Sequence, residues 1–189
     1  MRTRYFILFV FFTSNLQLVI GQINNIDSGF TNKSEAKDLK VNGLKEGKWF
    51  EYLDSASVTT TDTNAPYYCL RVYKSDKIRG LEREYYKSGK IRGEFFYTKS
   101  GSIDGISKTY YENGKIMNEA IFIKDTVNVM YKAFYENGNI EFEVPFINGK
   151  ENGVYKHYTE DGVLSREINY TDGKVGEIRD YDKNGNEVK

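Results

Sequence analysis

The feature that most constrains this chain is a short motif that returns at nearly fixed intervals. Its clearest copy, residues 110–116, reads Tyr-Tyr-Glu-Asn-Gly-Lys-Ile, with two aromatic residues before a turn-forming Asn-Gly and one aliphatic residue after it. A fixed period in this range is the sequence signature of a repeat protein. The turn glycines follow one another at intervals of 25, 24, 24 and 23 residues: Gly89, Gly114, Gly138, Gly162 and Gly185.

Each unit predicts two short strands joined by a tight turn. After the turn, apolar Ile140, Val144 and Phe146 alternate with Glu141 and Glu143, the period of a strand with one buried face. Tyrosine and phenylalanine, which favour strands, are abundant, with 16 Tyr and 12 Phe. The predicted fold class is all-β: an elongated antiparallel meander of tandem hairpins of about 24 residues, with about 11 or 12 strands.

The register of each hairpin depends on the length of its loop. A two-residue loop would place Lys108 opposite Glu119, and a surface ion pair contributes less than about 1 kcal/mol. A three-residue loop with a left-handed glycine gathers large apolar side chains on one face, and each contributes roughly 1.5–3 kcal/mol when buried. We therefore predict the three-residue loop, with Lys108 along the apolar face and Glu119 on the other. The predicted apolar face comprises Ile106, Tyr110, Ile116, Ala120 and Phe122.

The first 42 residues differ from the repeats. Residues 1–21 begin with Arg2 and Arg4, continue with an apolar run and end at small or β-branched residues, which is the pattern of a secretory signal peptide cleaved before Gln22. A membrane anchor is the alternative, but polar residues interrupt the apolar run. Residues 22–42 are polar and predict a flexible leader, and residues 43–189 form the repeat domain. The expected location is therefore outside the cytoplasm: periplasm, cell surface or extracellular space.

Charge and cysteine content exclude several classes of partner. The chain has 27 basic and 27 acidic residues, so its surface does not predict binding to nucleic acid, nor strong membrane binding once the signal peptide is removed. Cys69 is the only cysteine and predicts a buried thiol in the core rather than a disulfide.

The repeated motif, Tyr-Tyr-x-x-Gly-x-(Leu/Ile) with a second glycine opening the next strand, resembles the MORN repeat variant found in bacterial proteins labelled YwqK-family antitoxins. Residues 153–164 carry the closest copy, and residues 47–52 open in the same way. The resemblance implies an elongated, strand-rich, non-enzymatic module, which in some members lies beside toxins. This chain departs from the pattern at Val129, at Asp125 and in a long insertion in the first turn.

No residue pattern predicts catalysis, a cofactor or a metal. His157 is the only histidine, and the recurring glutamates repeat with the fold rather than forming one acid pair. The candidate partner-binding residues lie in two groups. For the first group the alternative to binding is ordinary cross-strand packing, and for the second it is an insertion that the fold merely tolerates. One group is the tyrosines opposite the predicted apolar face: Tyr86, Tyr111, Tyr131, Tyr135 and Tyr155. The other lies in the insertion at residues 54–66: Ser57, Thr60 and Asp62.

Three functions remain open at this point. The first is an exported non-catalytic module that binds a protein or a polymer of the cell envelope. The second, implied by the resemblance, is an inhibitor of the antitoxin or immunity type that binds a toxin. The third and least favoured is an enzyme acting on glycans. A second copy of the chain is a further candidate partner, because something must cover so long a sheet.

Overall fold

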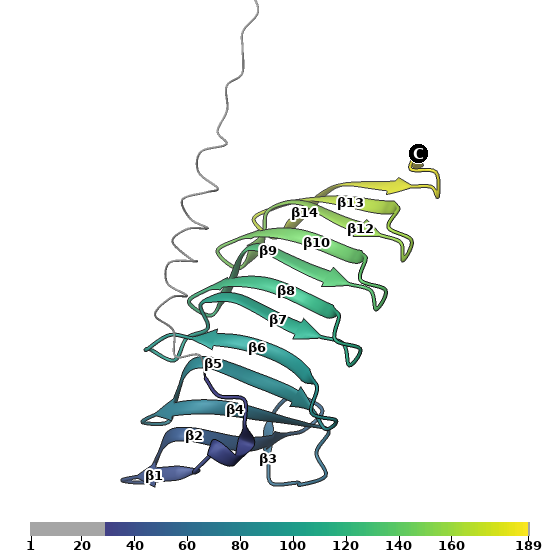
Figure 1. The fold of residues 1–189 in the computed structure, drawn as a ribbon. Coiled ribbons are helices and arrows are strands. Elements are labelled where there is room, and N and C mark those ends of the chain that lie inside the picture. The colour runs from purple at the N-terminus through teal and green to yellow at the C-terminus, as the bar shows by residue number, and fades with distance from the viewer. Residues whose placement is uncertain (1–28, 189) are drawn as a thin grey trace, which may run out of the picture.

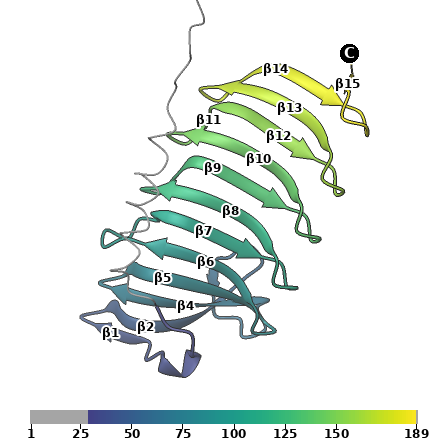
Figure 2. The ribbon, with the colours of Figure 1, turned by 45° about the horizontal axis from the view of Figure 1, so that its top comes forward.

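The computed structural model describes residues 29–188, and these form one antiparallel sheet of 15 strands in which chain neighbours lie side by side (Figure 1). The all-β meander predicted from the sequence is confirmed. Figure 2 shows the strands following one another as a single twisted layer from β1 to β14. The predicted signal peptide, residues 1–21, lies outside the described residues. Within residues 29–188, no helix is long and apolar enough to span a membrane.

Eleven strands of six to ten residues carry the sheet, in agreement with the predicted number. They are β2 (Leu44–Leu53), β4 (Tyr67–Lys74), β5 (Lys77–Tyr86), β6 (Ile91–Tyr97), β7 (Gly105–Tyr110), β8 (Ile116–Ile123), β9 (Thr126–Phe134), β10 (Ile140–Ile147), β12 (Gly153–Tyr158), β13 (Leu164–Thr171) and β14 (Lys174–Tyr181). The remaining elements are short: η1 (Lys33–Glu35), β1 (Leu39–Val41), β3 (Thr59–Thr60), β11 (Lys150–Glu151) and β15 (Glu187–Val188).

The repeated turn is the predicted three-residue loop. The backbone N–H of Tyr111 donates to Lys115 O at 2.9 Å, and the N–H of Gly114 donates to Tyr111 O at 2.8 Å. Gly114 has a φ of +88°, the left-handed conformation that glycine adopts without steric cost. The same pair of hydrogen bonds closes the turns at Gly89, Gly138, Gly162 and Gly185.

In four of the hairpins, a β-bulge shifts the strand register directly after the first residue pair that follows the turn. Tyr110 pairs with Ile116 as predicted, but Met117 is an extra residue, and Lys108 then lies directly opposite Glu119. Residues opposite one another share a face, so the prediction that the lysine and the glutamate point to different faces is wrong. Apolar packing near the turn and the cross-strand ion pair were treated as exclusive alternatives, whereas the bulge accommodates both. The residues at this bulge position are Arg92, Met117, Glu141 and Ser165.

The bulge also redistributes the predicted apolar face. Ile106 lies opposite Ile121, whereas Ser107 lies opposite Ala120 and Gly105 opposite Phe122. Ala120 and Phe122 therefore lie on the other side of the sheet from Tyr110, which corrects the prediction that they share its face.

Bulges also occur where one repeat joins the next, and glycine usually lies there. Gly80, Gly105 and Gly153 have φ values of +68°, +110° and +123°. Val129 occupies the equivalent position with a φ of +78°. A β-branched side chain is strained in this conformation, so the departure recognised in the sequence at Val129 is a strained position of the backbone.

The best-packed core lies at the N-terminal end of the sheet. Phe30, Leu70 and Tyr85 are 4%, 1% and 8% exposed and pack together, and Arg83 Nη1 donates to the carbonyl of Phe30 at 3.4 Å. The sequence predicted a flexible leader over residues 22–42. Its described part instead covers one face of the sheet, and β1 extends the sheet by pairing with β2. Phe30, the one aromatic residue of residues 22–42, supplies the anchor that the polar composition concealed.

Candidate binding surface

The two faces of the sheet carry different chemistry, which the register makes explicit. One face carries a straight row of alternating charge across nine strands, and we call it the charged face. Its row consists of Arg83, Glu94, Lys108, Glu119, Lys132, Glu143, Lys156, Glu167 and Arg179.

Ion pairs and tyrosine hydroxyls satisfy the row internally. Within repeats, Lys132 Nζ lies 3.1 Å from Glu143 Oε2, and the equivalent Lys108–Glu119 distance is 3.0 Å. Between repeats, the Tyr158 hydroxyl donates to Glu143 Oε1 at 3.3 Å. These contacts make the charged face a structural device that holds neighbouring repeats together. Equivalent tyrosine bonds join Tyr110 to Glu94 and Tyr181 to Glu167.

The opposite face, which we call the aromatic face, presents rings above small buried residues. The Tyr131 and Phe142 rings stack with centroids 5.7 Å apart, and Phe142 and Tyr155 lie 5.6 Å apart. Ala133 and Val144, beside these rings, are 5% and 6% exposed, while the three rings are half-buried. Between β7 and β14, the described residues provide no second layer over these rings (Figures 1 and 2).

A hollow of about 530 Å³ continues the aromatic face across β12, β13 and β14. It is open to solvent and contains an ion pair in which Arg166 Nε donates to Asp180 Oδ1 at 2.6 Å. Its lining residues are Tyr155, His157, Ser165, Arg166, Ile168, Tyr170 and Asp180.

The hollow brings together a serine and the only histidine, and their hydrogen bonds decide what this pair can do. Ser165 Oγ donates to the carbonyl of His157 at 3.0 Å and lies 2.7 Å from His157 Nδ1. Since the hydroxyl hydrogen is committed to the carbonyl, Ser165 accepts from Nδ1–H. The histidine is therefore a donor here and not a base poised to activate the serine.

Of the predicted partner-binding tyrosines, three connect adjacent turns. The hydroxyl of Tyr86 donates to Tyr110 O at 2.7 Å, and the hydroxyl of Tyr111 donates to Phe134 O at 2.6 Å. Tyr135 repeats the contact with Tyr158 O at 2.8 Å. Their hydroxyls are thus used inside the protein, although their rings remain half-exposed. The other two, Tyr131 and Tyr155, lie in the row of packed rings with Phe142.

The predicted binding residues of the insertion also make internal contacts. Arg92 Nη1 donates to Ser57 Oγ at 3.0 Å, whereas Thr60 Oγ1 accepts from Asp62 N and Asp62 Oδ1 accepts from Asn64 N. The insertion contains β3, which pairs with β2, and its Ser57 and Thr59 contact Arg92 and Arg71 of the sheet. Val58 is the large hydrophobic residue that the insertion exposes, at 59%.

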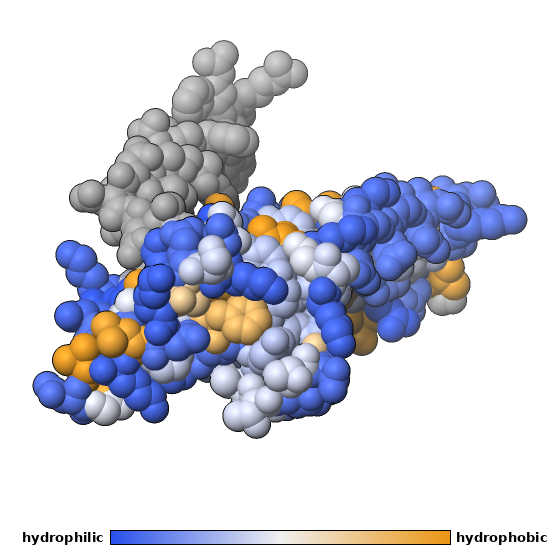
Figure 3. Space-filling view, turned by 60° about the horizontal axis from the view of Figure 1, so that its bottom comes forward, coloured by the Kyte–Doolittle hydropathy of each residue, from blue (hydrophilic) through white to orange (hydrophobic). Residues whose placement is uncertain are grey.

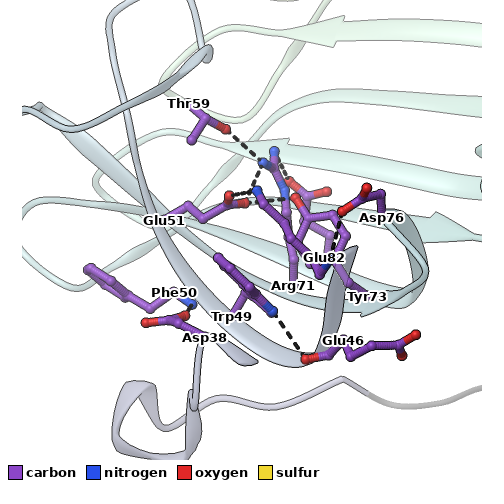
Figure 4. Close-up of polar contacts among 11 residues, drawn as sticks. Asp38, Glu46, Trp49, Phe50, Glu51, Thr59, Arg71, Tyr73, Asp76 and Glu82 are labelled. Carbon is purple, nitrogen blue, oxygen red and sulfur yellow. Dashed lines mark hydrogen bonds and ion pairs between the residues drawn. The ribbon is translucent and has the colours of Figure 1, made fainter. Parts of the chain in front are cut away.

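Beneath the insertion lies a buried polar cluster that the sequence did not predict (Figure 4). Arg71 lies 3.1 Å from Glu51 and 2.8 Å from Glu82, and its Nη1 donates to Thr59 of the insertion at 3.2 Å. Tyr73 donates to Glu51 at 2.8 Å, and Glu82 is only 1% exposed. The cluster fixes the insertion to the sheet through side chains that single-sequence patterns do not mark.

The carboxyl groups of this cluster titrate differently. Although burial opposes it, hydrogen bonds from Lys45 and Tyr73 lower the pKa of Glu51, whereas burial and the neighbouring Glu82 raise the pKa of Glu84. Arg92 forms an ion pair with Glu84. Two carboxyl groups with divergent pKa values can mark an acid–base pair, but these side chains are buried and engaged with arginines, and neither lines the hollow at β12 to β14. The cluster therefore has a structural role.

The structure also shows the environment of Cys69 and the arrangement of the possible metal-ligating side chains. Cys69 is free and fully buried as predicted, and burial raises the pKa of its thiol. Among residues 29–188, no group of histidine, cysteine, aspartate and glutamate side chains has the arrangement of a metal site.

Comparison with known families identifies the repeat. Residues 79–99, 103–124, 129–148 and 151–172 each match the MORN repeat variant. These four segments correspond to the hairpins β5–β6, β7–β8, β9–β10 and the strands β11 to β13. Four segments in the central part of the sheet are thus similar to the MORN repeat variant, a class of non-catalytic repeat that generally serves as a binding module for proteins or membranes. No curated protein matches the chain.

Proposed function

We propose that this chain is an exported, non-catalytic binding module whose aromatic face holds a protein or a polymer of the cell envelope. The observation that carries the proposal is the half-exposed row Tyr131, Phe142 and Tyr155, which continues into an open hollow. Rings of this kind supply large contact area at low entropic cost, and they are enriched in the centres of interfaces.

The charged face is a poorer binding surface. Its lysines and glutamates already neutralise one another in pairs, so a partner would have to break existing contacts to use them. A space-filling view of the β1 end shows mostly hydrophilic residues, with hydrophobic ones in small separate groups (Figure 3). The rings of the aromatic face are not held in such ion pairs, which supports this face as the site of binding.

A matched pair of substitutions tests which face binds. Ile178 on the aromatic face and Val154 on the charged face are 52% and 42% exposed, so Ile178→Asp and Val154→Asp place the same charge on opposite sides at little folding cost. The immobilised variants are incubated with envelope extract, and the proteins and polymers retained in stoichiometric amount are identified. We expect Ile178→Asp to lose the partner and Val154→Asp to keep it. The opposite pattern would overturn the assignment of the face.

The identity of the partner separates the alternatives. A stoichiometric toxin whose activity the chain blocks would establish the inhibitor function that the resemblance to YwqK-family proteins suggests. A structural protein or a glycan would support the module function. Export is tested on the same preparation, because N-terminal sequencing of the cell-derived protein should begin at Gln22.

A further inference from the structure

We propose that the hollow at β12 to β14 binds uncharged sugar units of a polysaccharide, with the aromatic row as its extension. This inference rests on the proposed function, because it names the class of ligand that the aromatic face takes. It involves residues that the sequence did not single out, chiefly Arg166, Ile168, Tyr170 and Asp180.

The first argument is the shape of the aromatic face. Tyr131, Phe142 and Tyr155 lie on consecutive strands, with interplanar angles of 18° and 34° between neighbouring rings. Their row runs across the strands and enters the hollow at Tyr155. Such a row presents half-exposed apolar rings in series, which offers a line of apolar contacts to the C–H groups of successive sugar rings, and the hollow has the volume of a small-ligand site.

The second argument is the polar lining. The side chains of Arg166 and Asp180 are 52% and 48% exposed, so they keep donors and acceptors free beyond their mutual ion pair. With Nδ1 of His157 donating to Ser165, Nε2 is the ring nitrogen left for a ligand. The hollow therefore offers both donors and acceptors, which hydroxyl groups of a sugar can use.

The third argument distinguishes sugar from other polymers. Strands β10, β12 and β13 are paired on both sides, so their backbone groups are not available to an extended peptide that would add a strand. Arg166 is balanced by Asp180. Burial raises the pKa of the Tyr131 and Tyr155 phenols, and the nearby negative charge of Glu141 raises both further. This charge balance does not favour nucleic acid or another polyanion, which needs a basic groove.

The test titrates the full chain with cellohexaose and N-acetylchitohexaose, using hexagalacturonate as the charged counterpart. Binding is followed by calorimetry and by the ring signals of the single histidine, His157. We expect a neutral hexasaccharide to bind at micromolar to millimolar concentration and to shift the His157 signals, with hexagalacturonate binding at least about tenfold more weakly.

Variants locate the site. Tyr155→Leu, which keeps the apolar volume, should weaken sugar binding about tenfold, a loss within the range of one aromatic contact with its buried area. Asp180→Asn should weaken it as well, whereas Val154→Ala on the opposite face should leave it unchanged. Thermal unfolding of each variant confirms that it is folded.

Three results would overturn the inference: no binding of either neutral sugar, equal binding by Tyr155→Leu, or tighter binding of hexagalacturonate. If the sugars fail while Ile178→Asp still abolishes capture of a protein partner, the sugar inference falls and the proposed binding module stands. If both fail, the aromatic face is not a binding surface.

Discussion

Lys108 on β7 lies directly across from Glu119 on β8, with 3.0 Å between Nζ and Oε2, although the turn that joins their strands pairs Tyr110 with Ile116. The single extra residue Met117 makes both relationships hold. The same combination recurs in three other hairpins, so the charge row and the apolar packing near the turn are one property of the repeat.

The Lys108–Glu119 pair should contribute little to stability. Its side chains are 35% and 32% exposed, so we expect a coupling free energy of about 0.5 kcal/mol in a double-mutant cycle of Lys108→Met and Glu119→Gln. Urea unfolding at low and high salt measures it, and the coupling should shrink as salt is added. A coupling that is large and independent of salt would contradict this expectation.

The tyrosines that connect successive turns should matter more than their exposure suggests. Tyr111→Phe removes a hydroxyl that donates to Phe134 O at 2.6 Å, and we expect it to lower the free energy of unfolding by about 1 kcal/mol. Tyr155→Phe is the matched control, because no hydrogen bond of its hydroxyl is seen among the described residues. Equal effects of the two substitutions in chemical denaturation would show that the inter-turn bond is unimportant.

Val129 should be a site where substitution stabilises the protein. Its φ of +78° is unfavourable for a β-branched residue, so Val129→Gly should raise the free energy of unfolding by about 1 kcal/mol after the entropic cost of glycine is deducted. Thermal and urea unfolding measure the change. Val127→Gly, in the same strand but outside the positive-φ positions, should destabilise the protein. A destabilised Val129→Gly would mean that the valine side chain contributes more than its strain costs.

Acid should weaken the buried cluster through Glu51. Burial opposes ionisation of Glu51, but the hydrogen bonds from Lys45 and Tyr73 together with the charges of Arg71 and Lys45 hold its pKa below the ordinary value of 4.5. The ionised carboxylate therefore stabilises the fold above that pH. This contribution is lost as the pH falls from 4.5 through the lower pKa of the folded state. Glu51→Gln should therefore reduce the slope of unfolding free energy against pH in this acidic range, although it lowers stability at neutral pH. An unchanged slope would place the acid sensitivity elsewhere.

The repeat could be predicted from the sequence because its signal is periodic. Gly114 and its equivalents marked the turns, and the alternation after each turn marked the strands, so fold class, strand number and loop type followed. The bulge at Met117 could not be predicted, because Arg92, Met117, Glu141 and Ser165 share no chemistry that marks the position. That one-residue shift moved Ala120 and Phe122, two of the five predicted apolar side chains, to the other face.

The candidate site was only partly predictable for the same reason. Tyr131 and Tyr155 were singled out as exposed tyrosines, and they do lie on the aromatic face. The partners that complete the hollow, Arg166 and Asp180, come from different repeats and meet only through the strand register. Phe30 was missed because one aromatic residue in a polar segment carries no period. The cluster around Arg71 was missed because buried charges look like surface charges in a single sequence.

The pairing of every long strand with its neighbours in the chain has a consequence for how such a molecule can change. No contact between distant repeats has to be preserved, so a hairpin unit could be duplicated or deleted while the remaining units keep their own neighbours. The reach of the aromatic row would then grow or shrink by whole units, and the length of polymer or partner that it spans would become a property set by repeat number.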